Sequence, residues 1–186
     1  AMVESQVYIQ IRTACKKNNV AALVLETIQG EGGDNHFRPD FFQELRKLAD
    51  ELDFLLILDE VQTGVGMTGK MWAYEHYGIV PDLIAFGKKT QVCGCASTDR
   101  VDNVPNVFKV PSRISSTWGG NIVDMVRATR IFQIIEEDNL VENAKKVGDY
   151  LLSKISSLGL SKVRGKGLLV AFDFDNGTDR NNALKR

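Results

Sequence analysis

Two ionisable side chains stand directly after strand-like apolar runs. Asp59 follows Phe54–Leu58, and Lys88 follows Asp82–Phe86 with only Gly87 between. A carboxylate at a strand end is partly desolvated and persists ionised only beside a cation. A lysine next to a glycine can enter a pocket, where its amine forms an imine once its pKa is lowered. Because parallel strands present their carboxyl ends at one edge of a sheet, we expect Asp59 and Lys88 to face one crevice.

Each of these residues has a plainer interpretation when taken alone. Asp59 could cap a neighbouring helix, and Lys88 could be solvated, as its neighbour Lys89 suggests. The pair is more informative than either residue. An anion that keeps a ring nitrogen protonated, together with an amine that forms an imine, is what a pyridoxal cofactor requires, and few other cofactors need both groups.

A glycine-rich loop after Asp59 permits a competing nucleotide-site interpretation. Gly64–Gly69 matches the spacing GxGxxG, and Gly64 to Lys70 nearly matches a phosphate-binding loop. Met71 stands where such a loop needs serine or threonine for magnesium. Residues 59–63 also separate the glycines from the preceding strand, although a dinucleotide-binding loop begins at the strand end. The nucleotide interpretation is therefore the weaker one, and it stays open.

The elements that must position these residues follow an α/β pattern. Runs that are apolar on both faces, such as Phe54–Leu58, indicate strands of a parallel sheet with helices covering both sides. We expect helices over residues 4–18, 39–52, 71–77, 121–134 and 140–156, and strands over 20–25, 54–58, 82–86, 91–97 and 167–174. The 91–97 strand is expected to be hairpin-like, residues 98–118 irregular, and the polar tail without a packed element.

Composition excludes several classes of function. The 186 residues carry a net charge of −1, so there is no basic excess to bind nucleic acid. No apolar stretch is long enough to span a membrane, and the first residues lack a signal-peptide pattern. Three cysteines, an odd number, fit a reducing cytoplasm. Cys93 and Cys95 lack further ligands at metal-site spacing, so we expect two buried strand residues and no metal site.

Beyond these physical arguments, three segments carry a family resemblance. Leu58–Gly64, the glycines and threonine of Gly66–Gly69, and Asp82–Lys88 resemble the class III aminotransferases in order and spacing. The resemblance covers nearly the whole chain. It implies the fold of the fold-type I pyridoxal-phosphate-dependent transferases, with pyridoxal 5'-phosphate as the cofactor.

A narrower resemblance lies in three further segments. Gln29–Pro39, Phe86–Gly94 and Pro111–Asn121 look like the L-lysine 6-aminotransferases of that family. This implies transfer of the terminal amino group of L-lysine to 2-oxoglutarate, giving an aldehyde and glutamate. The 4-aminobutyrate aminotransferases look similar around Glu31 and Gln62 but less so after Lys88, and ornithine is another candidate donor.

The resemblance implies a role for each matching residue. Lys88 would form the Schiff base with the cofactor and act as the acid and base of the proton shift. Asp59 would pair with the pyridinium nitrogen, and Gln62 would bond the ring hydroxyl. Thr117 would reach the phosphate of the neighbouring subunit's cofactor, which implies a homodimer. Glu31 would be a switch carboxylate that masks a substrate-binding arginine for one substrate and releases it for 2-oxoglutarate.

The resemblance also divides the chain and leads us to expect a fragment. Residues 1–120 would be the later part of the cofactor-binding large domain, 121–158 linking helices, and 159–186 the start of the small C-terminal domain. The phosphate cup and the aromatic that stacks on the ring should precede residue 1, and the substrate arginine should follow residue 186. A non-catalytic folded fragment therefore stays open beside the enzyme interpretation.

Overall fold

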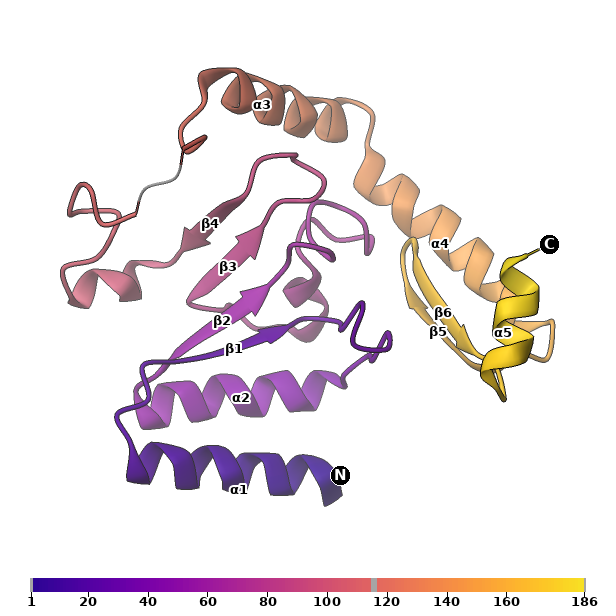
Figure 1. Ribbon diagram of the computed structural model, residues 1–186, viewed down its shortest axis with the longest axis horizontal. Helices are drawn as coiled ribbons and strands as arrows, with labels where there is room; N and C mark the ends of the chain where they lie inside the picture. The colour runs from indigo at the N-terminus through magenta and orange to yellow at the C-terminus, as the bar shows by residue number, and fades with distance from the viewer. Residues whose placement is uncertain (1, 115–116, 186) are drawn as a thin grey trace.

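The computed structural model describes residues 2–114 and 117–185 and contains two sheets (Figure 1). The larger sheet has the strand order β1-β2-β3-β4, with β1 (Ala22–Glu26), β2 (Leu55–Asp59), β3 (Leu83–Phe86) and β4 (Gly94–Ser97). The first three strands are parallel, and β4 runs antiparallel to β3. The smaller sheet is a hairpin of β5 (Ser161–Lys166) and β6 (Leu169–Asp173). The expected α/β class and hairpin-like fourth strand are confirmed.

The helices form a layer beneath the larger sheet and a connection to the smaller one (Figure 1). They are α1 (Met2–Lys17), α2 (Pro39–Leu52), α3 (Ile122–Glu137), α4 (Leu140–Ser156) and α5 (Gly177–Leu184), with 3₁₀ turns η1 (Ala73–Tyr77) and η2 (Asp99–Asn103). Helix α2 packs on β2 and α1 packs on α2, while α3 and α4 lead to the hairpin that α4 covers. Residues 115 and 116 of the expected motif 111–121 lie outside the described residues.

Helix α2 begins and ends as its sequence predicts. Pro39 occupies the first turn, where its missing N–H costs nothing, and Asp40 places a negative charge there. The helix ends at Asp53, which is left-handed at φ 54° and donates its N–H to the carbonyl of Ala49. The buried residues of α2 are Phe41, Phe42, Leu45, Leu48 and Ala49.

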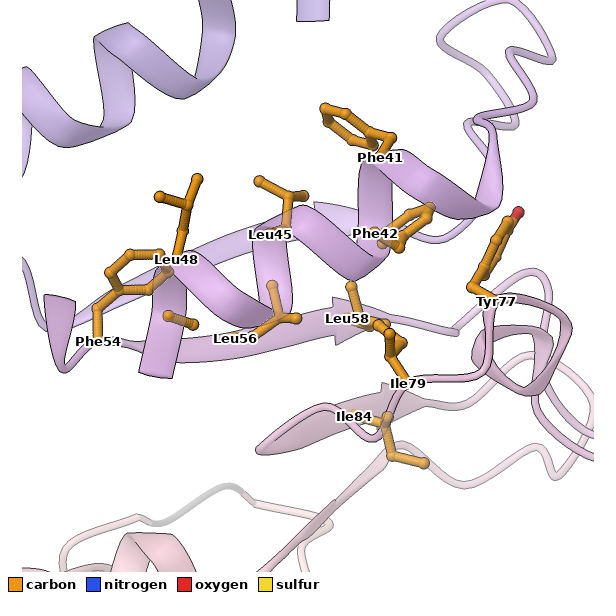
Figure 2. Close-up of a cluster of buried hydrophobic side chains, with 11 residues drawn as sticks. Phe41, Phe42, Leu45, Leu48, Phe54, Leu56, Leu58, Tyr77, Ile79 and Ile84 are labelled. Atoms are coloured by element: carbon orange, nitrogen blue, oxygen red, sulfur yellow. The ribbon is translucent and has the colours of Figure 1, made fainter. Parts of the chain in front are cut away.

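The main core lies between that face of α2 and the sheet (Figure 2). Phe42 packs against Tyr77 with ring centroids 4.4 Å apart, and both are fully buried with Leu56 and Leu58 of β2. Burying one such side chain stabilises the fold by about 1.5–3 kcal/mol. The Tyr77 hydroxyl donates to the carbonyl of Thr27, 3.2 Å away, just beyond β1. The core therefore fixes the strand ends where the candidate site lies.

The expectation that helices cover both faces of the larger sheet is wrong for the described residues. Leu56 and Leu58 face α2 and are buried, but Val24, on the opposite face of the outer strand β1, is 63% exposed. Helices α1 and α2 lie on the same side of the sheet (Figure 1). The apolar run of a parallel strand predicts burial on both faces, but it does not say which segment covers the second face.

Three further expectations need correction. Cys93 and Cys95 are exposed: Cys93 precedes β4, and Cys95 lies on β4, an outer strand with a neighbour on one side only. The polar tail, expected to lack a packed element, forms α5, whereas the expected strand 167–174 is confirmed as β6. The supposedly irregular stretch 98–118 contains η2. None of the helices in the described ranges has the combination of length and apolar character required to cross a bilayer.

Candidate active site

The parallel register brings polar side chains to one edge of the larger sheet. Glu26, Asp59 and Ala85 are register partners at the carboxyl ends of β1, β2 and β3. The chain leaves β3 through Gly87 and reaches Lys88. Asp59 is half-buried, and its Oδ1 accepts the N–H of Val61 at 2.9 Å, which fixes the carboxylate in the turn after β2. The structure therefore places Asp59 and the Lys88 segment at the ends of adjacent strands, as expected.

Gln62 joins this edge to the glycine-rich loop after β1. Lys88 Nζ donates to Gln62 Oε1 over 3.3 Å. A Cβ added to Gly30 would lie 2.2 Å from the same oxygen, so the amide rests directly on the Gly30 backbone. Only glycine allows that close approach without moving the side chain. The predicted residues Lys88 and Gln62 are thus in direct contact.

Lys89 lies deeper than Lys88. Lys89 is half-buried and donates to the backbone carbonyl of Gln62, whereas Lys88 is exposed. Burial lowers the pKa of Lys89, and the nearby charge of Lys88 lowers it further, against an opposing effect of Glu60. The two lysines therefore hold the same residue from two sides, one through its side chain and one through its backbone.

Thr90 fixes the turn that carries both lysines. Its side chain is fully buried, and Oγ1 lies 2.9 Å from the carbonyl oxygen of Gly87 and 2.8 Å from that of Val92. Gln91 is left-handed at φ 55°. A buried hydroxyl that bonds the backbone on both sides restricts how far the lysines can move.

Glu60 is a structural member of the site that the sequence motifs did not single out. It is buried, and its two oxygens accept four hydrogen bonds. The donors are the hydroxyls of Thr27 (2.9 Å) and Thr63 (2.8 Å) and the N–H groups of Ala73 (2.9 Å) and Tyr74 (2.8 Å). A charged residue directly after a buried strand is the signal that could have identified it. Glu60 ties the Asp59–Gln62 turn to β1 and to η1.

The remaining predicted residues lie outside this contact group. Glu31 is exposed at the loop that Gly30 begins, where the N–H groups of Gly33 and Asp34 both donate to the Gly30 carbonyl. Thr117 is exposed in the segment between η2 and α3. Among the described residues, no hydrogen bond or ion pair links Thr117 to Asp59, Gln62 or Lys88. The structure thus connects Glu31 to the group through its loop and does not bring Thr117 to it.

The glycine loop 64–69 is packed against other parts of the chain. A Cβ at Gly69 would lie 2.8 Å from Lys145 of α4. The N–H groups of Gly66 and Gly69 are already bonded to carbonyls in the same loop, those of Met71 and Gly66. Amides used in this way do not point toward a phosphate, which argues against the nucleotide interpretation.

Comparisons with known proteins agree with this geometry. The L-lysine-epsilon aminotransferase of Mycobacterium tuberculosis is 48% identical over the whole of this chain, which spans 43% of that relative. A 4-aminobutyrate aminotransferase of Kluyveromyces lactis is 42% identical over 89% of this chain and 36% of its own length. The chain therefore spans less than half the length of these relatives.

Solved structures and the family model give the same result. The lysine aminotransferase from M. tuberculosis in the internal aldimine form superposes with a TM-score of 0.93 at 47% identity, over 99% of this chain and 44% of that one. The family model described as aminotransferase class-III matches residues 3–186. Together with a lysine and a carboxylate at adjacent strand ends, this match places the chain in the class-III aminotransferase family.

Proposed function

We propose that this chain is the cofactor-bearing part of a pyridoxal-phosphate-dependent enzyme that moves the terminal amino group of L-lysine to 2-oxoglutarate. The contact between Lys88 Nζ and Gln62 Oε1, beside the strand that ends at Asp59, carries the proposal. The amino donor, L-lysine, is inferred from the L-lysine-epsilon aminotransferases that match the chain. The acceptor rests on the motif around Glu31 alone.

The residues fit the cofactor in the kind of groups that they offer. Gly30 lets the Gln62 amide approach the backbone closely, and this places the amide beside Lys88. Asp59 uses one carboxylate oxygen for the Val61 N–H, so its other oxygen can face a cationic ring nitrogen. Lys88 is exposed at the same edge and can reach a carbonyl. When bound, pyridoxal phosphate supplies an electron sink for the α-proton chemistry of amines.

Each side chain then has one task. Asp59 would hold a proton on the ring nitrogen, and Gln62 would bond the ring hydroxyl with the amide that it presents to Lys88. Lys88 would hold the cofactor through Nζ, and as a free amine it would take and return a proton at that atom. Glu31 would mask or release a substrate-binding arginine, and Thr117 would contact the phosphate of the partner subunit's cofactor in a homodimer.

The wider assignment follows the same proposal. Residues 1–120 form the later part of the cofactor-binding domain, 121–158 the linking helices, and 159–186 the start of the small domain. Helices α3 and α4 and the β5–β6 hairpin agree with those boundaries in position along the chain. A cytoplasmic location is part of the proposal and rests on the odd number of cysteines.

A second donor, 4-aminobutyrate, has support from one observation. The 4-aminobutyrate aminotransferase of K. lactis retains 42% identity over most of this chain. Both donors present a terminal amine and a distant carboxylate, so the Lys88 chemistry would be the same. The two proposals differ only in the groups that hold the far end of the substrate.

Spectroscopy on the purified chain tests the cofactor assignment. Pyridoxal phosphate should produce the yellow absorbance of an imine, and borohydride should fix the phosphopyridoxyl group on the peptide that contains Lys88. Lys88→Ala should abolish both signals because no other amine takes its place. Lys70→Ala removes an exposed lysine of the neighbouring loop and should leave both signals unchanged.

Two results would change the proposal. An imine that survives Lys88→Ala but disappears in Lys89→Ala would assign the reactive amine to Lys89. A chain that forms no imine would argue that the cofactor is not held by these residues alone. Where the imine forms, adding lysine, ornithine or 4-aminobutyrate separately should identify the donor by the loss of yellow absorbance. Adding 2-oxoglutarate should then restore it.

A further inference from the structure

Arg164 of the small hairpin reaches the glycine loop that carries Glu31. Its Nε donates to the carbonyl of Asp34 at 2.7 Å, and its Nη2 donates to that of Gly33 at 3.1 Å. These bonds join positions 130 and 131 residues apart in the sequence. A guanidinium offers five donors in a fixed plane, so it can hold two adjacent carbonyls at once.

The hairpin itself orients the guanidinium. Arg164 Nη1 donates to the carbonyl of Lys162 at 2.8 Å and to Asp173 Oδ1 at 2.9 Å. The Arg164 side chain is only 24% exposed. An arginine that is pre-oriented by its own strand pair loses little further freedom when it bonds the loop.

Arg164 contacts the loop at two residues with positive φ. Gly33 has φ 110° and Asp34 has φ 50°, a conformation that glycine adopts freely and aspartate more readily than most residues. Their N–H groups donate to the Gly30 carbonyl at 3.1 and 3.0 Å. Gly30 in turn lies directly beneath the Gln62 amide that accepts from Lys88. A continuous path of contacts therefore leads from Arg164 to Lys88.

A second contact docks the same hairpin on the neighbouring glycine loop. The N–H of Leu168 donates to the carbonyl of Met67 at 2.9 Å, and a Cβ at Gly167 would lie 2.5 Å from that oxygen. The hairpin thus touches both loops that flank Gln62, and Arg164 supplies its charged contact.

We propose that Arg164 is a positioning residue, which fixes the loop 29–36 and thereby sets where Gly30 supports Gln62 and where Glu31 is presented. The functional meaning rests on the proposed function, because Gln62 and Glu31 matter for catalysis only if Lys88 holds the cofactor. The fixing of the loop is independent of any cofactor. Lysine cannot replace Arg164, because one ammonium cannot span two carbonyls and Asp173 in the same plane.

Amide hydrogen exchange of the cofactor-free chain tests the fixing. Arg164→Lys keeps the charge beside Asp173 but loses the planar fork, so exchange at Gly33 and Asp34 should accelerate at least about tenfold. Arg180→Gln is the matched control. Arg164 and Arg180 both line a cavity of about 690 Å³, but the Arg180 guanidinium bonds Asn181 and not the loop. Exchange in the loop should be unchanged in this variant.

Asp173→Asn separates positioning from general stabilisation of the hairpin. It removes the ion pair but leaves the guanidinium on the loop. If Arg164 serves only the hairpin, Asp173→Asn and Arg164→Lys should both accelerate exchange in β5 and β6 and leave the loop protected. That pattern would overturn the proposal.

The imine absorbance supplies the functional readout. Arg164→Lys should weaken apparent binding of pyridoxal phosphate several-fold, and it should cause no further loss in a Gln62→Ala background, since both changes act along one path. Faster loop exchange in a chain that forms no imine would argue that the cofactor is not held by these residues alone, and it would leave the Arg164 role in the loop standing. Imine formation with unchanged loop exchange in Arg164→Lys would overturn the Arg164 role.

Discussion

Two adjacent lysines at the end of β3 meet different environments. Burial lowers the pKa of Lys89, which is often the mark of an imine-forming amine, but its ammonium is bonded to the Gln62 backbone. Lys88 donates to the end of the Gln62 side chain and is exposed at the edge that Asp59 shares. Accessibility favours Lys88 as the imine-forming residue, because an amine must approach a carbonyl carbon before its pKa matters. Lys89 is better suited to hold the Gln62 backbone in place.

Gly30 is the residue that controls the position of the Gln62 amide. In Gly30→Ala the added methyl would overlap Gln62 Oε1, which lies 2.2 Å from the ideal Cβ position. The flexible Gln62 side chain can swing away, so we expect the free energy of unfolding to change by less than about 1 kcal/mol. The displaced Gln62 side chain would no longer accept the hydrogen bond from Lys88. Pyridoxal phosphate should therefore bind several-fold more weakly in an absorbance titration.

Gly32→Ala is the matched control in the same loop. Its Cβ would meet Gln29 no closer than 3.4 Å, which is ordinary contact. Gly32→Ala should bind pyridoxal phosphate as tightly as the unchanged chain does. Equal binding by Gly30→Ala and Gly32→Ala would show that the Gln62 position has no influence on the cofactor.

At the level of elements, the turn between β2 and η1 depends on one buried carboxylate. Glu60→Ala leaves two hydroxyls and two backbone N–H groups without their acceptor. Unsatisfied buried donors are costly, so we expect a loss of about 3 kcal/mol or more in the free energy of unfolding, measured in urea. Asp59 and Gln62 flank Glu60, so cofactor binding should weaken in parallel.

Glu75→Ala provides a comparison for that loss. Glu75 is exposed, and it accepts one bond, from the Trp72 N–H at the start of η1. Removing such a cap costs about 1 kcal/mol. If the two variants were equally stable, the four bonds to Glu60 would not hold the turn.

The range of each interaction explains which parts of the site were predictable. Asp59 and Lys88 were identified because each follows a strand-like run, a pattern that spans only a few residues. Glu60 stands in the same motif, but its partner Thr27 lies 33 residues away. The loop contacts of Arg164 span 130 residues or more, and no local pattern indicates them. The exposure of Cys95 depends equally on the outer position of β4 in the sheet order.

At the scale of the whole molecule, the small hairpin is docked on the two glycine loops beside the larger sheet, and its side chains Arg164 and Lys166 lie near two histidines. Burial lowers the pKa of His36, and Arg164 and Lys166 lower it further, with Asp34 opposing. Burial also lowers the pKa of His76; Lys166 and Lys70 act in the same direction, while a bond to Thr68 and the charge of Glu75 oppose it. Burial and the neighbouring cations therefore both disfavour the charged form of each ring.

Half-buried histidines with lowered pKa values make the docking sensitive to mild acid. Because their folded pKa values lie below the unfolded value of about 6.5, the stability that they confer is complete above that pH. It is lost as the pH falls through the folded values. The carboxylates of Asp173 and Asp102 also have lowered pKa values, but their contribution is lost only at still lower pH. Mild acid should therefore report mainly on the histidines.

We expect the urea midpoint of unfolding to fall between pH 7.5 and pH 5.5, values chosen to bracket the ordinary histidine pKa of about 6.5. Protonation adds positive charge beside Arg164 and Lys166, so amide exchange in β5 and β6 should accelerate before exchange in the core strand β2. In a chain with both His36→Gln and His76→Gln the midpoint should depend much less on pH, because no ring remains to be charged. A midpoint that falls equally in the two chains would place the acid sensitivity elsewhere than at the docked hairpin.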